Sequence, residues 1–328
     1  MHALFRHGFG HSTPQPQNIS SLTLKKRLTS AQATLFTLLS LFSVGAFSTE
    51  LTPSSVTDGP YVFLDQGNQN TAYWICQSQL KQTPIANNQL ARPNDCGNLP
   101  QPKRHTDAPK VEADTYTHAG KIVALSDVHG QFDVMINLLK AHQIIDENNH
   151  WAFGDGHMVM TGDMFDRGHQ VNEVLWFLYE LDKQAQAAGG RLHLLMGNHE
   201  QMVFRGDLRY VNERYQTSAG LLNRSYDALY NKDTEIGRWL RSKNTLVKIN
   251  NLLFMHGGIS PEWVERKLNI SDANQLFRQH LDDKKEEGAF RISDDVHVVN
   301  HVDGEVVHTP PGNKELEVLI NDLCDFFN

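Results

Sequence analysis

Cysteine is scarce in this chain, with three among its 328 residues. Cys76, Cys96 and Cys324 lack the paired Cys-x-x-Cys spacing of structural zinc sites, which excludes zinc-finger folds. Cys76 and Cys96 share one N-terminal segment and could form a disulfide in an oxidising compartment, or could remain free thiols. If they pair, Cys324 is left over.

Positive charge is also in short supply. The chain has 30 Lys and Arg residues against 38 Asp and Glu residues, a net charge of −8 at pH 7. Proteins that bind nucleic acid generally need a net positive surface, so no nucleic-acid partner is expected. Any bound phosphate group must be held by a few local cations.

Long apolar runs are missing as well. Residues 33–47 carry no charge, but they are shorter than the roughly 20 apolar residues of a membrane-spanning helix. Basic residues 25–27 precede this run, and the small-x-small sequence Ala46-Phe47-Ser48 follows it. The pattern predicts a signal peptide region over residues 1–48, cleavage after Ser48, and a periplasmic or secreted protein that meets the membrane only before cleavage. An uncleaved anchor is the alternative.

The remainder divides by composition into an extension and an alternating region. Residues 49–117 are rich in Asn, Gln, Pro and Thr, and their strand-forming runs at 61–64 and 72–75 predict a β-hairpin. From residue 118 to 285, apolar runs alternate with helical patterns, which predicts an α/β fold with ligands bound at strand ends. The expected strands are 122–125, 158–160, 192–196 and 252–255, and the expected helices are 131–142, 171–187 and most of 201–242.

Each predicted strand is followed by a short polar motif. The four motifs are Asp127-Val128-His129-Gly130, Gly162-Asp163-Met164-Phe165-Asp166-Arg167-Gly168, Gly197-Asn198-His199-Glu200 and His256-Gly257-Gly258. One such motif alone could be an ordinary turn, but four at strand ends indicate a shared site. The expected metal ligands are Asp127, His129, Asp163, Asn198 and His256.

This ligand set has a definite chemistry. Asp127 and His129 are two residues apart and therefore point the same way from a strand end, while the two oxygens of Asp163 can bridge two metals. Mixed nitrogen and oxygen ligands suit two divalent ions of manganese, iron or zinc. The expected nucleophile is a hydroxide that bridges the two metals.

The neighbouring residues suit phosphate chemistry. Arg167 can hold phosphate oxygens through paired N–H donors, next to Asn198 and His199. His199 can protonate the leaving oxygen, and Asp166 can orient it. The predicted catalytic residues are therefore His199, Asp166 and Arg167, and the predicted phosphate contacts are Arg167, Asn198 and His199.

These motifs closely resemble those of the calcineurin-like metallophosphoesterases. The GD-x-x-DRG and GNHE motifs resemble the phosphoprotein phosphatase superfamily, and the sequence at 58–63 with the helical insertion after GNHE is similar to the bacterial Shewanella-like phosphatases. The resemblance covers residues 58–285, with Ser126 in place of a common glycine. It implies a phosphatase of phosphoserine, phosphothreonine or phosphotyrosine, a first metal on Asp127, His129 and Asp163, and a second on Asp163, Asn198 and His256.

The C-terminal segment departs from this family. The resemblance also implies a further metal-binding histidine and a further phosphate-binding arginine after His256. His308 is the candidate for that histidine. Residues 286–328 instead resemble the N-terminal part of a Fic-family domain, without the Fic signature. We therefore expect a phosphoesterase fold that is C-terminally incomplete, and an impaired activity.

Three functions fit these observations. The leading one is a metal-dependent phosphatase that acts on phosphoproteins or small phosphomonoesters. A non-catalytic remnant that binds metal or phosphate weakly is an alternative. A dinucleoside polyphosphate hydrolase is another, although the export signal argues against it because such substrates are cytosolic.

Overall fold

The computed structural model describes residues 55–64, 70–258, 267–283, 299–302 and 305–307. The chain divides into units Met1–Thr52 and Pro53–Asn328, and every described residue belongs to the second unit. The predicted signal region and His308 lie outside the described residues. Among the described residues, no helix has the length and apolar character needed to span a membrane.

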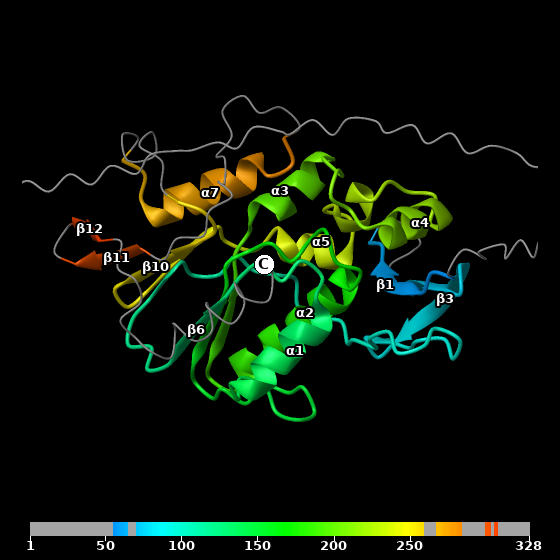
Figure 1. Cartoon of the computed structure of the whole chain (residues 1–328), viewed down its shortest axis with the longest axis horizontal. Helices are drawn as coiled ribbons and strands as arrows, with labels where there is room; N and C mark the ends of the chain where they lie inside the picture. The colour runs from blue at the N-terminus through cyan, green and yellow to red at the C-terminus, as the bar shows by residue number, and fades with distance from the viewer. Residues whose placement is uncertain (1–54, 65–69, 259–266, 284–298, 303–304, 308–328) are drawn as a thin grey trace, which may run out of the picture. The chain divides into compact units, whose positions relative to one another are not determined.

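The N-terminal extension forms a small antiparallel sheet in the order β1-β2-β3-β4 (Figure 1). Its strands are β1 (Asp58–Val62), β2 (Thr71–Cys76), β3 (Gln79–Ala86) and β4 (Gln89–Leu90). Tyr61 pairs with Tyr73, as the predicted hairpin requires. Asn87 and Asn88 turn the chain from β3 to β4 with φ of 50° and 63°, a left-handed conformation that asparagine tolerates well.

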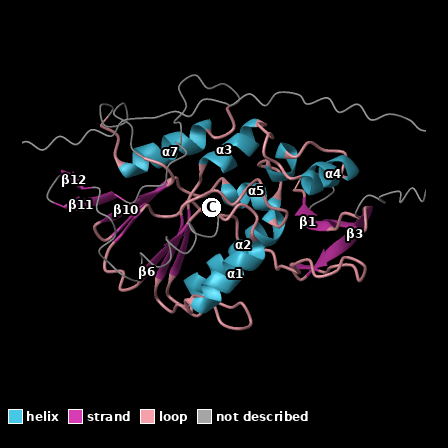
Figure 2. Ribbon diagram, in the orientation of Figure 1, coloured by secondary structure: helices cyan, strands magenta, loops and turns pink. Residues whose placement is uncertain are grey.

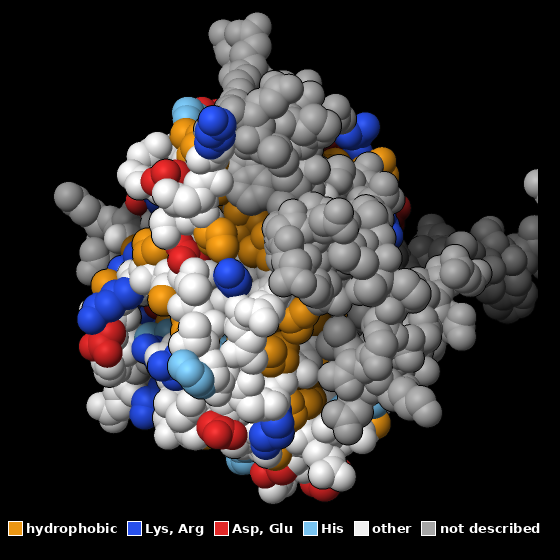
Figure 3. Space-filling view, turned by 90° about the vertical axis from the view of Figure 1, so that its left-hand side faces the viewer, with side chains coloured by type: hydrophobic (Ala, Val, Ile, Leu, Met, Phe, Trp, Pro, Cys, Tyr) orange, Lys and Arg blue, Asp and Glu red, His pale blue; other side chains and the backbone are white. Residues whose placement is uncertain are grey.

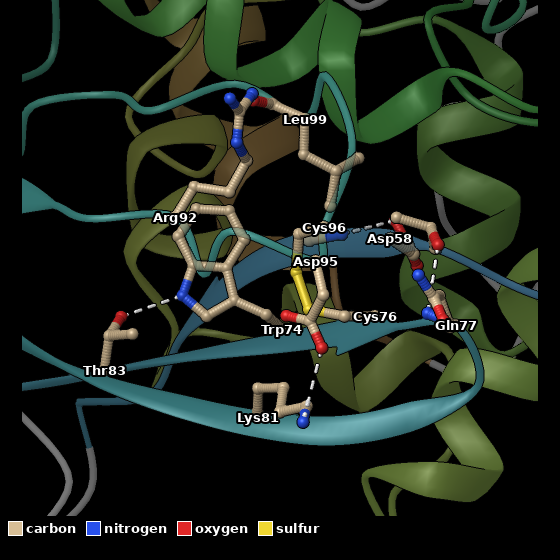
Figure 4. Close-up of a disulfide and its surroundings, with 12 residues drawn as sticks. Asp58, Trp74, Cys76, Gln77, Lys81, Thr83, Arg92, Asp95, Cys96 and Leu99 are labelled. Atoms are coloured by element: carbon tan, nitrogen blue, oxygen red, sulfur yellow. Dashed lines mark hydrogen bonds and ion pairs between the residues drawn. A yellow bond between two sulfur atoms is a disulfide. The ribbon is translucent and has the colours of Figure 1, made fainter.

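A disulfide closes this extension. Cys76 at the end of β2 is bonded to Cys96, and both residues are buried (Figure 4). The Lys81 ammonium lies 3.3 Å from the Asp95 carboxylate, and the Trp74 indole donates to the Thr83 hydroxyl at 2.9 Å. These contacts hold the loop after β4 against the sheet.

Three parallel strands form the central sheet, in the order β6-β7-β8. They are β6 (Ile122–Leu125), β7 (His157–Met160) and β8 (Arg191–Leu194). Helices α1 (Phe132–Ala141) and α2 (Val171–Ala187) connect them, as the βαβ pattern requires (Figure 2). All four β7 residues are buried, and three of them, Met158, Val159 and Met160, are apolar.

A second sheet has the order β12-β11-β10-β9-β5. Its strands are β5 (Thr115–Tyr116), β9 (Leu246–Ile249), β10 (Leu252–Met255), β11 (Val299–Val302) and β12 (Glu305–Val307). Val159 of β7 and Leu195, directly after β8, share a buried cluster with Val247 and Phe254 of the second sheet, so the two sheets share a core. β11 and β12 come from the segment predicted as a Fic-like tail, and they extend this sheet beyond the last predicted strand.

The segment between the third and fourth motifs is largely helical, as predicted. It contains α3 (Asn198–Arg205), α4 (Glu213–Leu221), the 3-10 helix η1 (Asp227–Tyr230) and α5 (Glu235–Leu240). Helix α7 (Ile270–His280) follows β10, and its buried Asn274 side chain binds the backbone of Thr245 and of Leu246, the first residue of β9. The predicted α/β fold is thus confirmed.

Charged side chains of both signs are interspersed on the described part of the face shown in Figure 3. This distribution agrees with a sequence in which acidic residues slightly outnumber basic ones.

Candidate functional site

The loops that follow the strands bring the four motifs to one place. The Asp127 N–H donates to the carbonyl of Gly162 at 3.2 Å, and the His129 N–H donates to the carbonyl of Asp163 at 2.9 Å. These bonds fasten the loop after β6 to the loop after β7. The ends of parallel strands lie at one edge of the sheet, which is why motifs far apart in the sequence meet.

Asp163 lies at the centre of the resulting cluster. Its Oδ2 atom is 3.6 Å from His129 Nε2, 3.5 Å from His256 Nε2 and 3.9 Å from His199 Nε2. The cluster contains two groups of ligand atoms, each lying within 4.8 Å of one another: His129, Asp163 and His199, and Asp127, Asp163 and His256. The structure thus contains two groups of three carboxylate or imidazole ligand atoms, and Asp163 belongs to both groups.

Asn198 joins the same cluster through His256. Its Oδ1 atom lies 2.7 Å from His256 Nε2. All five residues expected to bind metal therefore lie together in the structure. Their role as ligands remains a prediction.

The orientation of His129 suits a metal ligand. Its Nδ1–H donates to the carbonyl of Phe165 at 2.7 Å, which leaves Nε2 with a free lone pair facing Asp163. That Nε2 atom is buried and has no hydrogen-bond partner. Metal-binding histidines commonly have one ring nitrogen fixed by a carbonyl in this way.

Burial shapes the electrostatics of the cluster. It raises the pKa of Asp163 to about 9, with further contributions from the Glu200 and Asp127 carboxylates. Burial also lowers the pKa of His129 to about 4 and lowers the pKa of His256. A divalent cation among these groups would favour the ionised carboxylate and the neutral imidazoles, so the donor set fits a cation.

The backbone of the site is strained. Non-glycine residues with positive φ cost free energy and cluster where the surrounding structure fixes them. The motifs contain five such residues, with φ between 44° and 70°: Asp127, His129, Asp163, Asp166 and Arg167. A side chain at Gly162 would meet the backbone of Gly197 at 2.6 Å, so only glycine lets the second and third motifs approach this closely.

Glu200 is a site residue to which the sequence analysis assigned no role. It is fully buried, and its two oxygens accept four backbone N–H groups, from Gly197, Asp163, Met164 and Phe165 at 2.7 to 3.2 Å. A signal for it was available, because a glutamate three residues into a helix commonly binds the N-cap backbone. Its bonds to the second motif could not be read from the sequence.

His199 and Asp166 form a buried pair. Asp166 Oδ2 lies 2.6 Å from His199 Nδ1, and both residues are at most 4% exposed. Nε2 of His199 faces Asp163 Oδ2 at 3.9 Å. An Asp–His pair in this arrangement can hold a proton on Nε2 and deliver it at the cluster.

Arg167 follows Asp166 directly in the chain, and its side chain is exposed. Its N–H donates to the carbonyl of Tyr210 at 2.9 Å, and its own carbonyl accepts from the Asn212 side chain at 3.0 Å. Its backbone is therefore fixed by the loop that follows α3.

Comparison with known proteins identifies the family. The model of the calcineurin-like phosphoesterases matches residues 120–325, more than half of the chain. The chain belongs to the calcineurin-like phosphoesterase family. The match extends into the segment after residue 285, and members of this family use divalent metal ions.

Curated relatives point to one branch of the family. Shewanella-like protein phosphatase 1 of Plasmodium berghei is 33% identical over 168 residues, which cover 50% of this chain and 45% of that protein. Shewanella-like protein phosphatase 2 of Arabidopsis thaliana is 36% identical over 94 residues, 29% of this chain and 24% of that protein. The chain thus spans less than half the length of these two relatives.

Solved structures support the same branch and the fold. A cold-active protein tyrosine phosphatase shares 58% identity with a TM-score of 0.69, covering 71% of this chain and 69% of that chain. A cold-active protein-tyrosine phosphatase of a psychrophilic Shewanella species shares 59% identity with a TM-score of 0.68, covering 70% of each chain. The resemblance to Shewanella-like phosphatases is confirmed.

Proposed function

We propose that this protein is a metal-dependent phosphomonoesterase that hydrolyses phosphoproteins or small phosphomonoesters. The observation that carries the proposal is the convergence of His129, His199 and His256 on a single carboxylate oxygen of Asp163. Burial of an ionised carboxylate among imidazoles is costly, and a bound cation would offset that cost.

The donors divide naturally between two cations. Asp127, His129 and Asp163 would hold one, and Asp163, Asn198 and His256 would hold the other. Manganese, iron and zinc all suit these ligands. Bound divalent cations would supply Lewis acidity toward a phosphoryl oxygen and toward water.

The protein residues supply the remaining chemistry. Arg167, Asn198 and His199 would bind the phosphate oxygens. His199 would give its proton to the leaving oxygen, and Asp166 would stabilise the charged imidazole and hold its orientation. The 2.6 Å contact between Asp166 and His199 supports this division of roles.

The substrate class follows from the relatives. Both solved structures described above are protein tyrosine phosphatases, which supports phosphotyrosine as a substrate. Phosphoserine and phosphothreonine remain candidates, because the two curated relatives described above are protein phosphatases whose names state no preferred residue. If His308 does not complete the second metal site, we expect turnover to be reduced.

Metal analysis combined with turnover of p-nitrophenyl phosphate tests the proposal. We expect wild-type protein to bind divalent metal and to lose turnover on chelation, and Asp163→Asn to lose both properties. Asp155→Asn, an exposed aspartate just before β7, is the matched control and should behave as wild type. Turnover that survives in metal-free protein would disprove the mechanism.

Two other results would favour the alternatives. Metal binding without turnover of any phosphomonoester would indicate a non-catalytic remnant. Turnover confined to dinucleoside tetraphosphates would indicate the polyphosphate hydrolase.

We also propose that the protein is exported and processed after Ser48. The basic, apolar and small-residue pattern of residues 25–48 supports this location. The bonded pair Cys76 and Cys96, with Cα atoms 4.6 Å apart, suits an oxidising compartment. Mass spectrometry of the mature protein should find no peptide from residues 30–45.

A further inference from the structure

Tyr210 presents an aromatic ring to solvent at the edge of the candidate site. It is 49% exposed and is one of three exposed large hydrophobic residues in the described part of the chain, with Leu80 and Val111. Its ring centroid lies 5.5 Å from that of His199, with the ring planes inclined by 54°. The ring thus lies beside the residue assigned to protonate the leaving group.

The loop that carries Tyr210 is well fixed for a surface segment. The carbonyl of Tyr210 accepts the Arg167 N–H at 2.9 Å. The Arg209 guanidinium lies 5.5 Å from the centre of the Tyr210 ring, and Asp207 holds that guanidinium with bonds of 2.8 and 2.7 Å. Tyr210 therefore contacts both Arg167, the proposed phosphate-binding residue, and His199, the proposed proton donor.

The position of His199 determines where the leaving group lies. In the hydrolysis, the oxygen of water forms a bond to phosphorus and the bond from phosphorus to the ester oxygen breaks. The ester oxygen takes the His199 proton and leaves as an alcohol or a phenol, and the proton released by the water restores the proton on His199. The organic group on that oxygen must consequently lie on the His199 side of the site, near Tyr210.

We propose that Tyr210 is a specificity-determining residue that stacks against the aryl group of phosphotyrosine-like substrates. The proposal rests on the phosphomonoesterase function and refines its substrate class. Aromatic rings attract one another at centroid separations of about 4.5–7 Å. A phosphotyrosine ring offers this contact, whereas the methylene of phosphoserine offers little apolar surface.

Kinetics with matched peptides test this role in the full chain loaded with metal. We expect Tyr210→Ala to lower kcat/KM for a phosphotyrosine peptide by about 3- to 10-fold, mainly through KM, the size of effect that an aromatic pair supplies. A phosphoserine peptide of the same sequence should change less than about twofold. Tyr210→Phe keeps the ring and should retain the preference, and Leu80→Ala on β3 is the control for loss of an exposed apolar side chain.

A binding measurement separates this proposal from the function on which it rests. Calorimetry with phenylphosphonate and methylphosphonate, which are not hydrolysed, needs no turnover. Tighter binding of phenylphosphonate in wild type, with the difference erased in Tyr210→Ala, supports the role even if turnover fails. Equal binding of the two ligands by wild type, or equal losses for both peptides in Tyr210→Ala, would overturn it.

Discussion

Replacement of Glu200 by glutamine should damage the site although Glu200 contacts no substrate. One carboxylate oxygen accepts the N–H groups of Gly197 and Asp163, and the other accepts those of Met164 and Phe165. Glutamine has the same shape but one acceptor oxygen. Whichever oxygen becomes the amide nitrogen, two buried N–H groups lose their acceptor and face a donor.

The magnitude follows from the count of lost bonds. A hydrogen bond to a charged group contributes about 1.5–3 kcal/mol net, so two lost bonds predict a destabilisation of about 3–6 kcal/mol for Glu200→Gln. Because the freed N–H groups belong to the loops that carry Asp163 and Asn198, metal affinity and turnover should fall by about 10- to 100-fold.

Urea unfolding and metal competition with a chelator measure the two effects. Glu147→Gln makes the same chemical change on a side chain that is 93% exposed, and both measurements should match wild type. If Glu200→Gln has a free energy of unfolding within about 0.5 kcal/mol of wild type and binds metal normally, the four hydrogen bonds to Glu200 do not support the site as proposed.

Three further predictions concern other residues. His199→Ala should lower turnover of alkyl phosphates more than that of aryl phosphates, because an alkoxide needs the proton more; equal losses would remove His199 from the acid role. Asp58→Asn should destabilise the fold by about 3–5 kcal/mol without changing metal affinity. Asp58 is a buried acceptor for Tyr61 and Asn172, and it lies 3.7 Å from the Arg214 guanidinium. A free energy of unfolding in urea equal to that of wild type would contradict this prediction. Burial beside His157 lowers the pKa of His193 to about 3. As the pH falls, the unfolded chain therefore takes up a proton before the folded protein does, and the free energy of unfolding should decrease between about pH 6.5 and about pH 3. Urea unfolding followed against pH should show a smaller decrease for His193→Gln.

The sequence was sufficient to predict the elements that carry the motifs. The apolar runs at Ile122–Leu125 and Leu252–Met255 coincide with β6 and β10, and Val171–Ala187 coincides with α2. The two strands are mostly apolar, and the helix buries one face, so apolar runs and helical periodicity mark them. Because each motif follows such a run, the convergence of the site residues could also be predicted.

Elements with weaker local signals were missed. β9 (Leu246–Ile249) was left unassigned, although its two-residue turn Asn250-Asn251 into β10 is a recognisable hairpin signal. β5 (Thr115–Tyr116) has only two residues in a polar segment, and it exists because β9 offers a free edge for parallel pairing. Its cause lies in a partner more than a hundred residues away.

The same limit explains why the residues that support the cluster were missed, while the residues that form it were predicted. Glu200 fixes the backbone of residues 163–165 at one end of the second motif. At the other end, the Arg214 guanidinium and the Tyr215 hydroxyl both bind the carbonyl of His169. Each contact joins residues more than thirty positions apart, so no local pattern marks it.

Asp166 and Arg167 lie between these two fixed points. Their positive φ values, 70° and 61°, are conformations that a free loop would rarely keep. The hydrogen bonds at these two points stabilise the strained turn and hold the Asp166 carboxylate against His199. Arg214 also lies near Asp58 of β1, so the N-terminal sheet reaches the site through this residue. The N-terminal extension therefore contributes to the position of the turn that carries Asp166 and Arg167, although none of its described residues belongs to the cluster around Asp163.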